Sequence, residues 1–587
     1  MMNFNKAVRF LRIIPLAALI ASGFFTGCRR EVVSAADIIL RNGFINTADL
    51  RNVRADALAI KDGKFVYVGT NDGVKSYESK ATRIIDLDGR MVLPGFIDSH
   101  SHPTGMVKQL FAVSLYGLGS IQAYQKAVVD FAKAHPSAKA IRGSGWSNPL
   151  FPKTGPDRKM LDVIIKDIPV ALSSEDGHST WVNSKTLELA GITRKTPNPP
   201  GGVIERDPMT GEPNGTLREK AAGLATKIFP AYSVEELAKG LEAYQEMALS
   251  LGITTAHESS VGAGGSDIQA YKLLEKEGRL RMRFRASLHV DPGEGLEQIG
   301  SLVAEREKNK GPLFQTNAAK IFIDGVVEGG TAYLKEPYLH KPGYRGEFLW
   351  KADALDKMCA ELDRLGFQLH FHAIGDAAVA ETLDALAYAA GTNGKRDARP
   401  IITHLQLVSP QDILRFRQLS VVAVTQPYWF MKDDYYYLIQ VPYLGQERAD
   451  REYPMESFYK EGVVVASSSD YPVTIPCNPL QAIQIGMTRS RPDTKDPKEV
   501  LWPEEKATLD QMIAGFTWNG AYANFLERVT GSIEVGKSAD LVVLDGNLFD
   551  IPASEIGKIE VRLTFFEGRE AYRDKSFVLA PANGSQR

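Results

Sequence analysis

The sequence has few cysteines and no marked excess of charge of either sign. Its 587 residues include three cysteines and carry a formal net charge of −2. So few cysteines imply no disulfide framework, and near-neutral charge gives no sign of a nucleic-acid partner. No Cys-x-x-Cys pair occurs. Any metal must therefore be held by histidine, carboxylate or an oxygen derived from lysine.

The chain also has no ordinary membrane-spanning helix near its start, although it begins with an apolar run. Three basic residues precede this run at residues 13–25, and a Thr-Gly-Cys sequence follows and ends in Cys28. The run is too short to span a bilayer, but its flanks are those of an export signal. We predict a lipoprotein signal peptide at 1–28 with lipidation of Cys28. A plain signal peptide remains the alternative, since Phe25 stands where such motifs usually have leucine.

This leader predicts an exported protein that is lipid-anchored to a bacterial membrane and faces the periplasm or the cell exterior. Its membrane contact would be the lipid alone, because the rest of the composition is ordinary for a soluble globular protein, with 44% hydrophobic and 24% charged residues. The sequence gives no prediction of oligomeric state.

Short strands and tight turns occupy both ends of the mature chain. Residues 35–93 contain Asn-Gly and Asp-Gly turns between apolar runs, and a similar pattern returns within 516–578 after a short helix. Neither end has enough strands to bury a sheet alone. We therefore expect the two ends to pair into one small β-sandwich.

Helices and strands alternate between these ends. Ser233 and Glu236 form a capping box, and Ser409-Pro410 marks another helix start. Eight strand candidates lie at 96–102, 253–257, 283–289, 318–323, 368–372, 401–404, 421–424 and 463–467. The alternation predicts an α/β fold, a (β/α)8 TIM barrel at 94–515. The long gap after the first strand predicts an insertion subdomain at about 105–230.

Histidines and one aspartate gather at the ends of the predicted strands. In a strand, residues two apart point to the same side, so His100 and His102 can bind one metal ion together. Active sites of such barrels lie at the carboxyl ends of the strands. The residues predicted there are His100, His102, Lys320, His370, His372, His404 and Asp470.

These segments together resemble the amidohydrolase superfamily, specifically its YtcJ-like (amidohydrolase-3) branch. The resemblance covers nearly the whole mature chain. It is most specific at residues 94–102 (PGFIDSHSH), 318–325 (AAKIFIDG), 372–376 (HAIGD) and 469–472 (SDYP), and it extends to 176–184 (DGHSTWVNS).

The resemblance implies a site with one or two divalent metals, usually zinc. His100 and His102 would bind the more buried ion with Asp470, and His372 and His404 would bind the second. Lys320 would be carbamylated and bridge both ions. Metal-bound water has a pKa near 7, so Asp470 could take its proton and pass it to the leaving nitrogen of a small-molecule amide.

Several assignments have alternatives in the sequence. Lys320 could be an unmodified lysine beside a single metal, and His370 could replace His372 as a ligand. We expect His178, Trp146 and His257 to contact the substrate. His178 and Trp146 could instead be structural, and His257 could instead bind metal.

The sequence therefore predicts a metal-dependent hydrolase of C–N bonds other than peptide bonds. A deaminase or a lactone or ester hydrolase would use the same site. An inactive ligand-binding lipoprotein is the alternative from another class, and the presence of every expected ligand argues against it.

Overall fold

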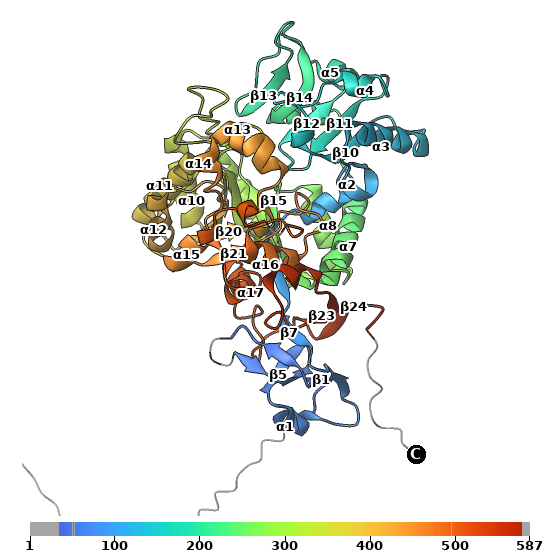
Figure 1. Cartoon of the computed structure of the whole chain (residues 1–587), viewed down its shortest axis with the longest axis vertical. Coiled ribbons are helices and arrows are strands. Elements are labelled where there is room, and N and C mark those ends of the chain that lie inside the picture. The colour runs from blue at the N-terminus through green and yellow to red at the C-terminus, as the bar shows by residue number, and fades with distance from the viewer. Residues whose placement is uncertain (1–33, 50, 52, 495, 578–587) are drawn as a thin grey trace, which may run out of the picture.

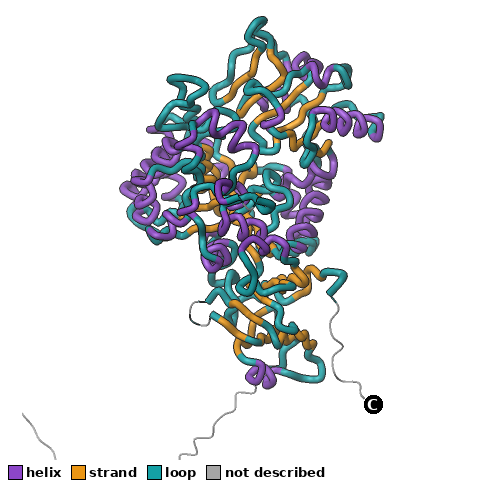
Figure 2. The backbone as a smooth tube through the Cα atoms, in the orientation of Figure 1, coloured by secondary structure: helices purple, strands orange, loops and turns teal. Residues whose placement is uncertain are grey.

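A computed structural model describes residues 34–49, 51, 53–494 and 496–577. These residues form three parts along the long axis, namely an α/β insertion, a barrel and a β-sandwich (Figure 1). Strands occur in all three parts and most helices surround the barrel (Figure 2). The predicted signal peptide and Cys28 lie outside the described residues. Within the described ranges, no helix has both the length and the apolar character needed to cross a membrane.

The barrel consists of eight parallel strands at the predicted positions, which confirms the predicted fold class. The strands are β8 (Phe96–Ser101), β15 (Ile253–Val261), β16 (Arg283–His289), β17 (Phe314–Phe322), β18 (Gln368–Ala373), β19 (Ile401–His404), β20 (Val422–Thr425) and β21 (Val465–Ser467). They follow one another around the sheet in chain order. Between the first and last strands, Asp470 N donates to His100 O at 2.8 Å and His102 N donates to Tyr471 O at 2.6 Å. These bonds close the barrel where the site residues begin.

Helices cover the outside of the barrel, and their ends follow from local sequence. Ser233 and Glu236 form both bonds of the capping box that begins α7. Proline occupies the first position of α12, where a missing N–H costs nothing. The helices are α7 (Val234–Ser250), α8 (Ser266–Lys276), α9 (Ile299–Lys308), α10 (Ala352–Arg364), α11 (Asp376–Asn393), α12 (Pro410–Gln418) and α16 (Pro479–Thr488). Their apolar faces and the strands share one large core.

Both ends of the chain build the sandwich. One sheet contains β5 (Lys64–Gly69), β4 (Ala57–Lys61), β1 (Ile38–Arg41) and β6 (Arg83–Asp86). The other contains β24 (Arg569–Arg573), β23 (Val561–Phe566), β22 (Leu541–Leu544), β7 (Met91–Pro94), β2 (Phe44–Asn46) and β3 (Arg54–Ala55). Arg283 of the barrel forms a buried ion pair with Asp540 at 2.9 Å. This pair ties the sandwich to the base of the barrel.

The insertion is a six-stranded sheet with its own core. Its strands are β13 (Gly202–Arg206), β14 (Pro213–Glu219), β12 (Ser179–Val182), β11 (Val170–Ser174), β10 (Ile141–Trp146) and β9 (Val113–Ser114). Helices α3 (Ile121–Ala134), α4 (Lys159–Asp162) and α5 (Ser184–Ala190) pack beside it. The insertion follows β8 and lies beyond one end of the barrel (Figure 1).

Candidate functional site

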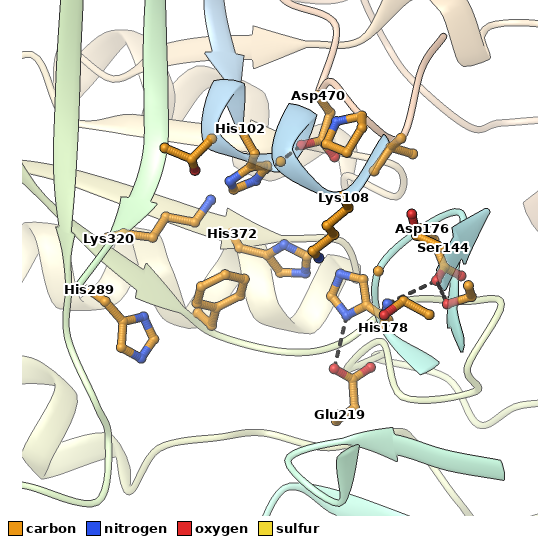
Figure 3. Close-up of a pocket in the computed structure, with 18 of the residues that line it drawn as sticks. His102, Lys108, Ser144, Asp176, His178, Glu219, His289, Lys320, His372 and Asp470 are labelled. Atoms are coloured by element: carbon orange, nitrogen blue, oxygen red, sulfur yellow. Dashed lines mark hydrogen bonds and ion pairs between the residues drawn. The ribbon is translucent and has the colours of Figure 1, made fainter. Parts of the chain in front are cut away.

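A cavity of about 790 Å³ lies between the carboxyl ends of the barrel strands and the insertion. All six predicted metal-site residues line it, although they come from five strand ends: His100, His102, Lys320, His372, His404 and Asp470. Figure 3 shows Lys320 extending toward His102, and His372 extending toward His178.

The most compact part of the site surrounds Asp470. Its Oδ1 lies 3.4 Å from His100 Nε2 and 3.4 Å from His102 Nε2, and its Oδ2 lies 3.9 Å from His404 Nδ1. Ligand atoms of His100, His404 and Asp470 all lie within 4.8 Å of one another. Bonds of 2.0–2.1 Å to a tetrahedral zinc ion place ligand atoms roughly 3.3–3.4 Å apart. The donor set and its spacing therefore fit a zinc-like ion.

The backbone at this cluster adopts conformations that are rare outside glycine. His404 has φ 76° and Asp470 has φ 56°, and such strain commonly marks functional positions. Asp98 accepts hydrogen bonds from the backbone and the side chain of Ser469, at 2.9 and 2.5 Å. These bonds hold the residue before Asp470 against the strand that carries His100.

A buried glutamate orients His102. Oε1 of Glu258 lies 3.5 Å from His102 Nδ1 and has no hydrogen-bond partner among the described residues. Its Oε2 accepts from the backbone of Thr104 and from the Tyr271 hydroxyl. Burial opposes protonation of His102, but the nearby carboxylates of Asp470 and Glu258 raise its pKa to about 9. The two carboxylates thus supply negative charge that either a proton or a metal cation can compensate.

His372 and His404 lie side by side with their ring centroids 4.5 Å apart. His372 Nε2 donates to Gly325 O at 3.2 Å, which leaves the Nδ1 lone pair free. Gln426 Oε1 lies 3.2 Å from His404 Nδ1, and the Gln426 amide donates to two hydroxyls. His404 Nδ1 is therefore the donor, and its Nε2 lone pair is free. The lone pairs of two nitrogen atoms, His372 Nδ1 and His404 Nε2, are thus available to bind a second ion.

Lys320 is 1% exposed on β17. Burial lowers the pKa of Lys320 to about 7, although the charge of Asp470 acts in the opposite direction. A substantial fraction of this amine is therefore uncharged at neutral pH.

His178 reaches the cavity from the insertion. Its Nδ1 donates to Glu219 Oε2 at 2.9 Å, and its ring centroid lies 5.3 Å from that of His372. Burial opposes the charged form, but the charge of Glu219 and its hydrogen bond outweigh burial and raise the pKa of His178 to about 9. The cavity thus contains a protonated imidazole whose second N–H is free to contact a ligand.

A second chamber of about 290 Å³ adjoins the cavity and shares His178, His372, His404 and Asp470 with it. Its other polar walls include the carboxylates of Glu175, Asp176, Glu328 and Asp433, and its aromatic walls include Tyr428, Trp429, Tyr435 and Tyr453. The described residues that line this chamber include no lysine or arginine. Burial raises the pKa of Glu328 to about 7.

Comparison with known proteins agrees with this architecture. The model of the amidohydrolase family matches residues 83–572. The chain belongs to the amidohydrolase family. It is 30% identical to the putative amidohydrolase YtcJ of Bacillus subtilis (strain 168), over 91% of this chain and 99% of that protein. It is 25% identical to the N-substituted formamide deformylase of Arthrobacter pascens, over 91% of this chain and 97% of that protein.

A solved structure is similar as well. An uncharacterized metal-dependent hydrolase from Pyrococcus furiosus is 27% identical, with a TM-score of 0.66, over 87% of this chain and 99% of that chain. The likeness covers the whole of that hydrolase, so this amidohydrolase shares its complete architecture rather than an isolated barrel.

Two of the expected substrate contacts of this amidohydrolase do not reach the cavity. Trp146 is fully buried in the insertion core, where its indole N–H donates to Leu172 O at 2.8 Å. Ser144 lines the cavity, but Gly145 has φ 102° and the strand register shifts between Ser144 and Trp146. This irregularity turns Trp146 into the insertion core, so the structure does not place Trp146 among the residues that line the cavity.

His257 is also absent from the cavity wall. It is fully buried inside the barrel and contacts Asn524 and Ser287. His370 also lies inside the barrel, two residues before His372 on β18, and its Nε2 faces His100 Nδ1 at 2.8 Å. Of the two histidines of β18, only His372 lines the cavity.

Glu258 and Glu219 were not among the residues predicted from the sequence. Glu258 follows His257 at a strand end, where a carboxylate is a recognisable signal for a functional position. Glu219 lies 41 residues after His178 at the end of an insertion strand. No sequence pattern connects these two residues, because their contact depends on how the insertion folds.

Proposed function

We propose that this amidohydrolase cleaves the C–N bond of a small amide with a divalent metal, most simply zinc. The observation that carries the proposal is the pair of 3.4 Å distances from Asp470 Oδ1 to His100 Nε2 and His102 Nε2. A carboxylate held this close to two histidine nitrogens suits a metal ligand that also serves as a base.

Two sets of residues would hold metal. His100, His102 and Asp470 form the first, and His372 and His404 the second. A carbamate on Lys320 would join them as an anionic oxygen ligand. Carbamate formation requires an uncharged amine, and the lowered pKa of this buried lysine, about 7, favours it. When bound, a divalent metal lowers the pKa of a coordinated water and polarises a carbonyl.

Asp470 and His178 would divide the proton chemistry. Asp470 accepts a proton from the attacking water as the water oxygen bonds to the amide carbonyl carbon. It then passes this proton to the leaving nitrogen as the C–N bond breaks. His178 donates its free N–H to the carbonyl oxygen, where negative charge develops. Glu219 keeps that imidazole charged and oriented. A preorganised charged donor stabilises the developing negative charge most strongly in a site shielded from water.

The second chamber suggests which amides fit. Its carboxylates and aromatic rings would disfavour an anionic substituent and accommodate an aromatic or cationic one, because buried like charges repel and aromatic faces attract cations. The relative from Arthrobacter pascens is a deformylase of N-substituted formamides. We therefore propose amides with a neutral aromatic or cationic amine portion, formamides among them.

Turnover and metal content test this function together. The purified protein is assayed on formamides, acylated amino acids, lactones and aminopurines, with formamides that differ only in the charge of the amine portion. We expect bound divalent metal, amide cleavage, and the highest kcat/KM for neutral aromatic or cationic amines. Cleavage of lactones or deamination alone would replace the amide assignment. Stoichiometric metal without turnover of any class would favour a binding protein.

For location, we propose an exported protein anchored through lipid on Cys28. The order of basic residues, apolar run and Thr-Gly-Cys sequence supports it. Multiple acylation of one cysteine gives stable anchoring, whereas one chain binds only marginally.

A further inference from the structure

A line of hydrogen-bonded side chains crosses the barrel interior and ends at His100. Asn524 Oδ1 lies 2.7 Å from His257 Nδ1, and His257 Nε2 lies 2.7 Å from Ser287 Oγ. Ser287 Oγ lies 2.9 Å from His370 Nδ1, and His370 Nε2 lies 2.8 Å from His100 Nδ1. All five residues are at most 1% exposed.

Such a line can carry its protons in only two arrangements. A neutral imidazole has one N–H and one acceptor nitrogen, and a hydroxyl has one hydrogen. Each contact therefore determines the direction of the next. Burial keeps the ring next to Asn524 neutral, because it lowers the pKa of His257 to about 4. In one arrangement every bond points toward Asn524, and in the other every bond points toward His100.

The Asn524 amide decides between the two arrangements. Its Nδ2 donates to Gly520 O at 2.9 Å, so its Oδ1 faces His257 and can only accept. His257 Nδ1 is then the donor, and its Nε2 accepts from the Ser287 hydroxyl. The Ser287 oxygen accepts from His370 Nδ1, and His370 Nε2 accepts from His100 Nδ1. The Nε2 atom of His100, 3.4 Å from Asp470 Oδ1, is left with a free lone pair.

We propose that Asn524, His257, Ser287 and His370 are positioning residues that set the tautomer in which His100 can bind a metal. This inference rests on the proposed function only in taking His100 as a ligand. The opposite tautomer would place a hydrogen on the Nε2 atom and block coordination. His102 is oriented differently, by the Glu258 carboxylate. The two proposed ligands at the end of β8 are therefore oriented by different means, His100 by a line of uncharged side chains and His102 by a charged carboxylate.

The test compares two buried hydroxyls. Ser287→Ala removes the link between His257 and His370, and Ser287→Thr keeps a hydroxyl. Thr316→Val removes a hydroxyl of the neighbouring strand that bonds Asn309 instead. The zinc dissociation constant is measured by chelator competition, with melting temperature as the check on folding. Outer contacts of metal-binding histidines are typically worth 10–100-fold in affinity, so we expect that loss for Ser287→Ala and less than threefold for the other two variants.

Histidine ring NMR gives a second measurement that needs no metal. In chelator-treated protein labelled with ¹⁵N in histidine, His100 should show a protonated Nδ1 and an unprotonated Nε2, and Ser287→Ala should mix the two forms. Unchanged zinc affinity in Ser287→Ala, or a protonated Nε2 on His100 in the wild type, overturns the inference. Wild-type protein that binds no zinc defeats the proposed function, and the NMR spectrum then still decides whether the line of bonds sets the tautomer.

Discussion

The charge on His178 predicts an alkaline limit of activity that one substitution should move. Glu219 accepts from His178 Nδ1 at 2.9 Å, and the two side chains are only 18% and 12% exposed. The pKa of about 9, against an ordinary 6.5, corresponds to about 3 kcal/mol of extra stabilisation of the charged ring, at 1.36 kcal/mol per tenfold change. Glu219→Gln keeps the shape and a hydrogen-bond acceptor but removes the charge.

The sign of the effect follows from the raised pKa. The imidazole is charged below its pKa and becomes neutral as pH rises through it. In the wild type, kcat/KM should therefore fall as pH rises through about 9. Without the charge of Glu219, burial opposes the charged ring and only the charges of Asp176 and Asp470 still favour it, so the pKa of His178 should fall toward its ordinary value of 6.5. The charged fraction at pH 8 then drops from about 90% to about 3%, and kcat/KM should drop about 30-fold.

The assay is kcat/KM against pH for the wild type, Glu219→Gln and a matched control. Glu188→Gln removes one exposed carboxylate of the same insertion, which forms an ion pair with Lys185, and should leave the profile unchanged. His178→Asn should remove the alkaline limb altogether. An alkaline limb that stays near pH 9 in Glu219→Gln would refute the reasoning, because the charge of His178 would then not depend on Glu219 or would not matter for turnover.

Other substitutions test the remaining assignments. Asp470→Asn should lower kcat by about 10²–10⁴-fold through loss of the base, and full turnover would show the base to be another group. Lys320→Arg should abolish two-metal binding measured by elemental analysis, since guanidinium forms no carbamate, whereas short carboxylic acids should partly restore Lys320→Ala. Trp146→Phe should leave kcat/KM within twofold but cost about 1–3 kcal/mol of stability in chemical denaturation, because Leu172 O loses its partner. Cys28→Ser should release the protein from membranes in cell fractionation, and normal cleavage with unchanged retention would exclude this anchor.

The strand ends could be predicted from sequence because alternation and turn residues repeat along the whole barrel. The depth of a side chain within the barrel could not. His370 and His372 point to the same side of β18, as residues two apart must, yet one meets the cavity and the other meets His100 from inside. For His257, too, the sequence does not show whether an inward-facing side chain lines the cavity or lies inside the barrel. Sequence spacing therefore predicts which side of a strand a residue faces, but not how deep its side chain lies within the barrel.

The contacts made within the insertion also could not be predicted from the sequence. Trp146 faces its core only because a left-handed glycine and a register shift rotate the strand after Ser144. Glu219 meets His178 through the pairing of β12 with β14, in which Ser179 lies opposite Arg218. Such contacts depend on tertiary arrangement, which local pattern does not encode.

The closure of the barrel has a consequence for how this protein acquires its site during synthesis. The bonds that join the first and last strands come from the backbones of His100, His102 and Asp470, and Ser469 reaches Asp98 across 371 positions of sequence. A nascent chain can therefore contain most of its barrel strands and still lack both the proposed base, Asp470, and Ser469, which holds it against the first strand. Barrel closure and completion of the site depend on the same segment, so metal retention would report whether residues 469–471 have docked against the first barrel strand. Any truncation before residue 469 removes the proposed base and the contacts that close the barrel together.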